Sequence, residues 1–70
     1  MKVTIYFKAA NQWRHYSMDE EEFKRLQEDF SNFLKSGEPK GGGYTMAVDE
    51  MYADTTPRTV LLKFDDITFA

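Results

Sequence analysis

The stretch DEEEFKRLQEDFSNFLKSG, residues 19–37, decides the fold, because its apolar residues recur at the spacing of an α-helix. Asp19 and Glu22 have the spacing of a capping box, and Gly37 is placed to end the helix in a left-handed conformation. The apolar side chains form one stripe along this helix, made of Phe23, Leu26, Phe30, Phe33 and Leu34. One face of the helix must therefore pack against another element.

Alternation of apolar and polar residues predicts strands on both sides of this helix, over residues 2–8, 13–18, 43–49 and 59–64. The stretch DDITFA, residues 65–70, fits either a turn or an extension of the last strand. The order is β-β-α-β-β, with neighbouring strands antiparallel. We predict a single α+β domain over residues 1–70, in which the amphipathic helix packs on one face of an antiparallel sheet of about four strands.

The glycine-rich stretch EPKGGGY, residues 38–44, raises the question of a phosphate-binding loop. Such loops place a lysine after the glycines and a helix N-terminus behind the phosphate. Here Lys40 precedes the glycines, and the loop follows the negative C-terminal end of the helix. We therefore interpret residues 41–43 as a flexible connection between helix and strand. The alternative is a mobile lid over a partner or ligand.

Composition limits how this chain can be stabilised. It has 70 residues, no cysteine and one histidine, which excludes disulfides and thiolate metal sites and argues against any metal or cofactor. A core of this size rarely supplies more than about 3–5 kcal/mol alone. We therefore expect a homo-oligomer, and the absence of cysteine favours the cytoplasm.

Charge and hydropathy narrow the choice of partner. The net charge is −3 with an isoelectric point near 5.0, so binding to nucleic acid is not expected. No apolar run is long enough to span a membrane. The acidic run DEEE, residues 19–22, is explained by capping and by ion pairs along the helix, Glu20 with Lys24 and Glu21 with Arg25. The alternative is that it recognises a partner.

The cluster WRHY, residues 13–16, carries the residue types of a binding surface. Tryptophan and tyrosine stack on rings or grip peptides, and arginine or protonated histidine holds anions. Alternation along the strand separates Trp13 and His15 from Arg14 and Tyr16, so only one pair can face the helix. The other pair lies on the open face of the sheet or in an interface between subunits. Ser17 shares a face with His15, but no acid is placed to complete a triad, so no catalytic residue is predicted.

Two functions remain open from the sequence. The first is a non-enzymatic inhibitor or adaptor that binds a protein partner stoichiometrically; the chain's outline resembles many short phage and bacterial proteins. The second is an oligomeric sponge that holds a nucleotide or similar anion between subunits. The candidate binding residues are common to both functions: Tyr6, Trp13, Arg14, His15, Tyr16, Lys40, Tyr44 and Arg58.

Overall fold

The computed structural model describes residues 1–52 and 54–69, and it confirms an α+β fold with one helix and an antiparallel sheet. The elements are β1 (Lys2–Phe7), β2 (Gln12–Ser17), α1 (Glu20–Ser36), β3 (Gly41–Val48), β4 (Arg58–Lys63), the 3-10 turn η1 (Phe64–Asp66) and β5 (Ile67–Phe69). The sheet has five strands rather than about four. After β4 the chain turns through η1, and the stretch left open in the sequence returns as β5 alongside β1.

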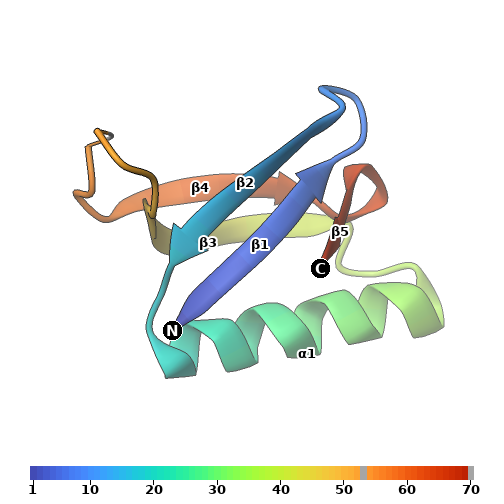
Figure 1. Cartoon of the computed structure of the whole chain (residues 1–70). Coiled ribbons are helices and arrows are strands. Elements are labelled where there is room, and N and C mark those ends of the chain that lie inside the picture. Colours follow the sequence, from blue (N-terminus) through green and yellow to red (C-terminus); the bar gives the residue numbers. More distant parts are fainter. Residues whose placement is uncertain (53, 70) are drawn as a thin grey trace.

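The sheet consists of two hairpins that meet over a short contact. Its strand order is β4-β3-β2-β1-β5, and β2 pairs with β3 only at Tyr16–Val48 and Ser17–Ala47. Beyond that contact the hairpins diverge, so that β1 and β2 run diagonally across β3 and β4 (Figure 1). In the β1–β2 turn, Asn11 has a φ of 50°, the left-handed conformation that asparagine tolerates.

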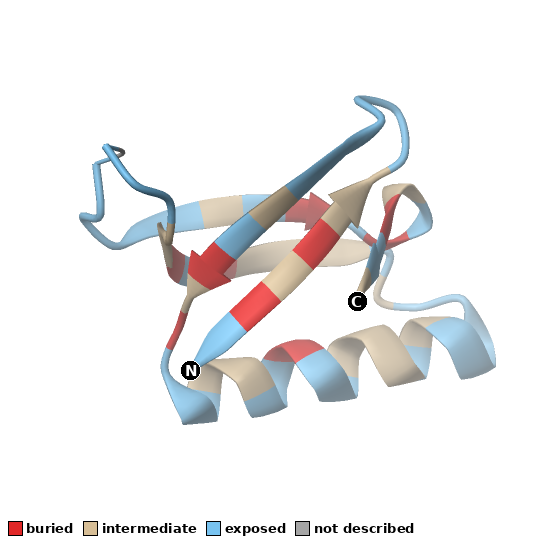
Figure 2. Ribbon diagram, viewed as in Figure 1, coloured by how far each residue is buried: buried red, intermediate tan, exposed pale blue. Residues whose placement is uncertain are grey.

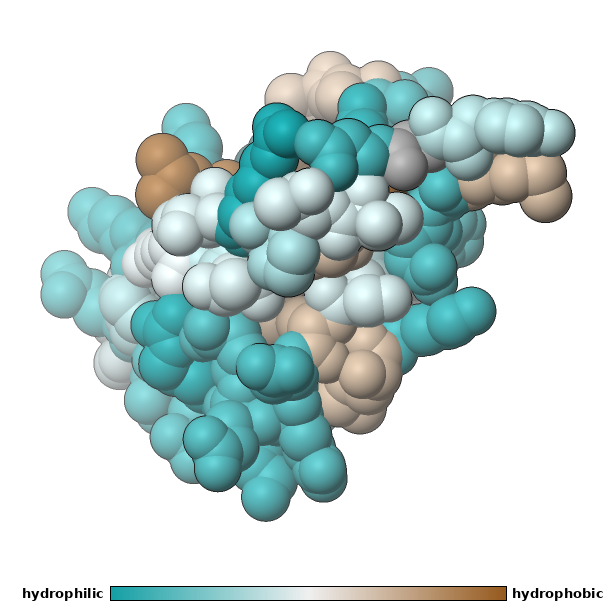
Figure 3. Space-filling view, turned by 90° about the vertical axis from the view of Figure 1, so that its left-hand side faces the viewer, coloured by the Kyte–Doolittle hydropathy of each residue, from teal (hydrophilic) through white to brown (hydrophobic). Residues whose placement is uncertain are grey.

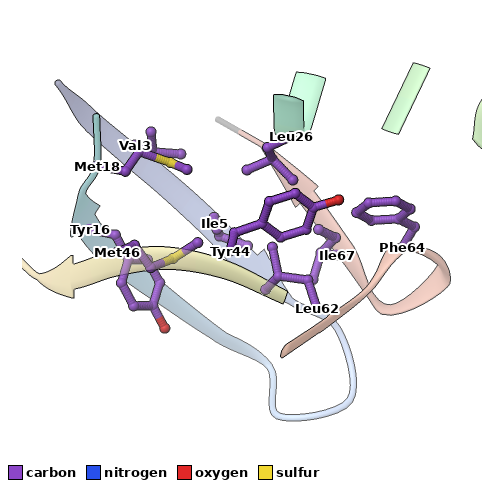
Figure 4. Packing of buried hydrophobic residues seen from close by; sticks show 10 residues of the cluster. All are labelled: Val3, Ile5, Tyr16, Met18, Leu26, Tyr44, Met46, Leu62, Phe64 and Ile67. Atoms are coloured by element: carbon purple, nitrogen blue, oxygen red, sulfur yellow. The ribbon is translucent and has the colours of Figure 1, made fainter. Parts of the chain in front are cut away.

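The core lies between the facing sides of the two hairpins and the helix (Figure 2). Helix α1 runs along the lower side of the molecule and closes the gap between the hairpins there (Figure 1). Tyr44 lies at the centre of this cluster, whereas the hydroxyl of Tyr16 points away from it (Figure 4). The buried residues come from every element: Val3, Ile5, Tyr16, Met18, Leu26, Tyr44, Met46, Leu62, Phe64 and Ile67.

The helix forms where its pattern predicts, with two local differences. Gly37 ends it in the left-handed conformation, donating its backbone N–H to Phe33. The predicted capping box is absent, because the Asp19 side chain makes no capping hydrogen bond and Glu22 accepts from Arg25 instead. Leu34 belongs to the predicted apolar stripe but is 70% exposed. The stripe therefore continues past the edge of the sheet that it covers.

The prediction of a flexible connection at residues 41–43 is wrong, because all three glycines belong to β3. Gly41 pairs with Lys63 and Gly43 with Leu61, in register with the rest of the β3–β4 hairpin. Glycine is required at position 41, where a Cβ atom would lie 2.1 Å from the carbonyl oxygen of Leu62. A phosphate-binding loop is excluded as well, since this backbone is engaged in a strand ladder.

Two helix side chains hydrogen-bond to the backbone of β3 on the side that faces away from β4. By the alternation of the β3–β4 ladder, Gly43 and Thr45 direct their backbone groups away from β4, on the side where β2 has diverged. The Arg25 guanidinium donates to the Gly43 carbonyl at 2.7 Å, and the Thr45 N–H donates to Glu22 at 3.3 Å. Hydrogen bonds, chiefly that from Arg25, hold the pKa of Glu22 below its ordinary value. The ion pair predicted between Glu21 and Arg25 is thus replaced by one between Glu22 and Arg25.

Candidate binding site

The pairing of β1 with β2 divides the predicted site residues between two faces. Directly opposed residues of an antiparallel pair share a face, and Tyr6 pairs with Trp13 while Ile5 pairs with Arg14. Ile5 is fully buried. Trp13 and His15 consequently lie on the face directed away from the core, and Arg14 and Tyr16 on the face directed into it.

The outward face carries a small ordered cluster, which we call the sheet-face patch: Thr4, Tyr6, Asn11, Trp13 and His15. The rings of Tyr6 and Trp13 pack with their centroids 4.9 Å apart at an angle of 45°. The Tyr6 hydroxyl donates to the Asn11 carboxamide oxygen, which fixes one side of the pair. Trp13 nevertheless remains 51% exposed. The patch thus presents an aromatic side chain that is already held in place.

His15 has a different neighbour from the one that the sequence suggested. Its Nδ1 lies 2.9 Å from the Thr4 hydroxyl across the hairpin. Asp49 donates its backbone N–H to the His15 carbonyl, while its carboxylate lies 3.4 Å from the Lys2 ammonium. Among residues 1–52 and 54–69, no carboxylate hydrogen-bonds to the ring of His15. A hydroxyl and an imidazole are therefore present without the acid that would orient them for catalysis.

The predicted cations Arg14 and Arg58 lie in a groove between the diverging hairpins. This groove, on the side away from α1, encloses about 230 Å³ and is also lined by Glu50 and Asp54. Arg58 donates to Asp54 at 2.6 Å, and Thr56 hydrogen bonds hold the Asp54 pKa below its ordinary value. The groove thus holds two acids beside its two arginines, and this balance does not favour the binding of an anion there.

Two predicted binding residues are part of the core. Tyr44 is fully buried, where its hydroxyl donates to Asp29 at 2.6 Å and the Arg25 guanidinium lies 4.4 Å from its ring. Burial and the bond to Asp29 both raise the Tyr44 pKa. Tyr16 is also buried; burial raises its pKa, and the nearby Arg14 charge opposes that rise. These two candidate binding residues are therefore core residues and not part of an exposed surface.

Lys40 is exposed and lies just before β3, where its carbonyl accepts from the Phe64 N–H. Of the four predicted cationic residues, only His15 shares a face with Trp13. Arg14 lies on the opposite face of β2, with Arg58 in the groove between the hairpins, and Lys40 lies just before β3. An anion stacked on Trp13 and held by all four would require residues from more than one subunit, as the sponge hypothesis assumed.

Comparisons with protein-family models, curated proteins and solved structures found no match to this chain. Within the described part of the chain, no group of three or more histidine or acidic side chains is arranged to hold a metal ion. None of the described helices is long and apolar enough to cross a membrane. The side of the molecule where α1 begins is mainly hydrophilic, consistent with a solvated acidic run (Figure 3).

Sequence reasoning missed Thr4 and Asn11 as members of the sheet-face patch. Neither residue type stands out in a strand or a turn. Both would have been found by assuming a short turn around Asn11, since that turn sets the register and places Thr4 opposite His15.

Proposed function

We propose that this chain is a non-enzymatic module that binds a protein partner stoichiometrically in the cytoplasm, through the sheet-face patch. One observation carries the proposal: Trp13, half-exposed, is held against Tyr6 on a sheet face that the helix does not cover. Tryptophan and tyrosine are enriched at protein interfaces, where they dominate the binding energy.

The packing of Trp13 supports recognition rather than chance exposure. A free tryptophan side chain must lose rotamer freedom on binding, which costs part of the affinity. Contact with Tyr6, itself hydrogen-bonded to Asn11, restricts the Trp13 ring before any partner arrives. Thr4 and His15 add polar groups beside it that can donate to or accept from a partner.

The single tryptophan provides the experiment. The chain is immobilised, and a partner protein captured on it from a lysate of the source organism is purified. This partner is then titrated into the free chain while tryptophan emission is recorded. We expect a blue shift that saturates at a fixed molar ratio, since Trp13 leaves water. In calorimetry, Trp13→Ala should weaken binding by about tenfold or more, the range of an interface hot spot.

Tyr52→Ala is the matched control, because Tyr52 is 99% exposed and lies in the connection between β3 and β4. It should bind the partner as the unmodified chain does. Unchanged affinity in Trp13→Ala, or an emission spectrum that does not move at saturation, would refute the choice of the sheet-face patch.

We also propose that the chain forms homo-oligomers, for which β4 is the available edge. The Phe64 N–H bonds to the Lys40 carbonyl, and the same alternation directs the backbone groups of Thr59, Leu61 and Lys63 away from β3. Leu61 is 81% exposed on this strand. Antiparallel pairing of two β4 strands centred on Leu61 would cover both leucines and set Lys63 opposite Thr59 of the other copy.

Sedimentation from low to high micromolar concentration tests this assembly. The sedimentation coefficient should rise with concentration for the unmodified chain and stay constant for Leu61→Lys. A strict monomer over the whole range contradicts the proposal.

A further inference from the structure

Charge is divided unevenly between the β1–β2 hairpin and the rest of the chain. Residues 1–18 contain Lys2, Lys8 and Arg14 and no aspartate or glutamate, so their net charge is +3. Residues 19–70 contain six lysines and arginines and twelve acids, so their net charge is −6. Every member of the sheet-face patch belongs to the positive segment. A local field of this sign attracts anionic groups of a partner and repels cationic ones.

Two lysines flank the sheet-face patch along β1. Ile5 points into the core and strand residues alternate between faces, so Lys2 and Lys8 belong to the same outward face as the patch. The bond from the Lys8 N–H to the Asp66 carbonyl, at 2.8 Å, keeps Lys8 in register with β5. Lys8 is exposed. The patch therefore has an ammonium group at each end.

One of these two lysines is matched by an acid in the described part of the chain. The Lys2 ammonium lies 3.4 Å from Asp49, whereas no carboxylate of residues 1–52 and 54–69 lies within ion-pair distance of Lys8. Asp66, across from Lys8, instead accepts the Ala9 N–H at 2.9 Å and lines a groove on the inner side of β2. The charge of Lys8 is therefore available to an acidic group of a partner.

His15 supplies a second group that suits an acid. The Thr4 hydroxyl lies 2.9 Å from Nδ1 of His15. When this hydroxyl donates to Nδ1, the ring proton is on Nε2, which then donates to an acceptor such as a carboxylate oxygen. His15 is exposed, so a partner reaches this nitrogen from solvent.

These groups follow a fixed order along the hairpin. Lys8 is two positions from Tyr6, which packs on Trp13, and the pair of Thr4 with His15 is two positions from Tyr6 on the other side. Residues two positions apart on one face of a strand are about 7 Å apart. A side chain that contacts Trp13 therefore has a cation on one side and a hydrogen-bonding pair on the other, each about one such step away.

We propose that the protein partner presents an acidic segment to the sheet-face patch, with an apolar side chain on Trp13 and a carboxylate at Lys8. The inference rests on the proposed function, because it specifies the chemistry of the partner that binds there. A protein segment suits this face better than a nucleic acid. Nucleic-acid binding neutralises several phosphates at once, whereas the described part of this face offers two lysines, of which Lys2 already lies beside Asp49.

The probe is a capped heptapeptide, Ser-Asp-Ser-Phe-Ser-Asp-Ser, in which an acid lies two positions on either side of phenylalanine, so that either chain direction places one at Lys8. A matched peptide carries asparagine in place of both aspartates. Binding is measured from amide NMR shifts of the chain at low and at high salt. The acidic peptide should shift Lys8, Trp13 and His15. At low salt it should bind about threefold to tenfold more tightly than the asparagine peptide, and this difference should shrink at high salt, because exposed charges are screened.

Lys8→Glu and Lys63→Glu form a matched pair of variants. Both lysines are exposed and both changes lower the net charge by two, but Lys63 belongs to β4, on the other hairpin. Lys8→Glu should weaken binding of the acidic peptide about threefold to tenfold, and Lys63→Glu should change it by less than about twofold. A third peptide, with lysine in place of both aspartates, should bind Lys8→Glu more tightly than it binds the unmodified chain. That gain requires a folded variant with an intact patch.

Four results would overturn the inference. They are equal affinity for the acidic and asparagine peptides at low salt, shifts confined to residues outside the sheet-face patch, no shift with any peptide, and tighter binding of octathymidylate than of the acidic peptide. The last result would assign this face to a nucleic acid.

The purified partner separates this inference from the proposed function. Lys8→Glu and added salt should both weaken its binding. If Trp13→Ala weakens partner binding while Lys8→Glu and added salt leave it unchanged, the partner binds the patch without an acidic segment, and this inference alone fails. Unchanged partner binding in both variants refutes the proposed function as well.

Discussion

Substituting Gly41 by alanine tests the central structural correction, that the three glycines form a strand. An alanine Cβ at this position would lie 2.1 Å from the Leu62 carbonyl oxygen and 3.3 Å from the Lys63 Cα, whereas ordinary contact begins near 3.4 Å. Both obstacles are backbone atoms, so no rotamer change relieves the overlap. The two strands must separate locally by the difference, 3.4 − 2.1 = 1.3 Å.

That separation has a calculable cost. It would break the adjacent bond from the Phe64 N–H to the Lys40 carbonyl, now 2.9 Å, and weaken the next hydrogen-bonded pair of the ladder, Gly42 with Leu62. Each ladder bond contributes about 0.5–1.5 kcal/mol, and displacing the buried Leu62 and Phe64 adds a packing loss of about 1 kcal/mol. We expect Gly41→Ala to lower the free energy of unfolding by about 2–4 kcal/mol. A chain of this length has only about 3.5–10 kcal/mol to lose.

Gly43→Ala is the control two residues along the same face of β3. There a Cβ would meet only side-chain carbons, of Thr59 at 3.0 Å and Leu61 at 3.3 Å, and Leu61 can move into solvent. Replacing glycine also stabilises by about 0.4–1 kcal/mol through the unfolded chain. The free energy of unfolding of Gly43→Ala should therefore stay within about 1 kcal/mol of the unmodified chain.

Urea unfolding followed by circular dichroism distinguishes these outcomes. With a slope of about 1 kcal/mol per molar urea, Gly41→Ala should lower the midpoint by about 2–4 M, or leave the chain unfolded without urea. If residues 41–43 were a flexible connection, both alanine variants would be slightly more stable than the unmodified chain. Equal midpoints for the two variants would refute the reasoning.

Three further predictions follow from single side chains and from the charge arrangement. Tyr44→Phe should cost about 1–2 kcal/mol in urea unfolding, because it removes the hydrogen bond to Asp29. Burial raises the Tyr44 pKa, so the neutral side chain stabilises the fold fully below about pH 10, where the tyrosine of the unfolded chain ionises, and this contribution falls at higher pH. Above that pH the free energy of unfolding of Tyr44→Phe should therefore decline less steeply than that of the unmodified chain. Parallel curves of stability against pH would contradict this. Tyr52 has a φ of 71°, a left-handed conformation that is strained for tyrosine and not for glycine. Tyr52→Gly should therefore raise the free energy of unfolding by up to about 1 kcal/mol, and a loss of stability would count against strain at this position. Calorimetry with mono-, di- and cyclic nucleotides should give no heat, whereas saturable heat would favour the nucleotide sponge over protein binding.

The helix could be predicted because its signals are local. Its apolar stripe, its first-turn acids and Gly37 all lie within the 19 residues of the stretch from 19 to 37, and each is decided by neighbours three or four positions away. The capping box failed because Glu22 pairs with Arg25, three residues along, rather than with the start of the helix. Its second partner, the Thr45 N–H, is 23 positions along, and no local pattern indicates it.

The prediction for the glycine stretch was wrong because its pairing partners lie far along the chain. Three consecutive glycines have low strand propensity, and helix-to-strand connections are usually short and flexible. Their conformation is set instead by pairing with residues 61–63, about 20 positions later. The Tyr44 ring also covers Gly42, lying within 3.2 Å of where a Cβ would be, which replaces the packing that a side chain would provide.

The position of the candidate site follows from combining a local rule with one long-range fact. Alternation separated Trp13 and His15 from Arg14 and Tyr16 correctly, but it could not say which pair faces the core. Pairing of Tyr16 with Val3 and Val48, both on the inner face, decides it, because β2 lies between β1 and β3 only at that end. The divergence of the hairpins places Arg14 in a groove between them, because Arg14 faces inward. Trp13 is exposed because the same register directs it to the outer face of β2, opposite Tyr6.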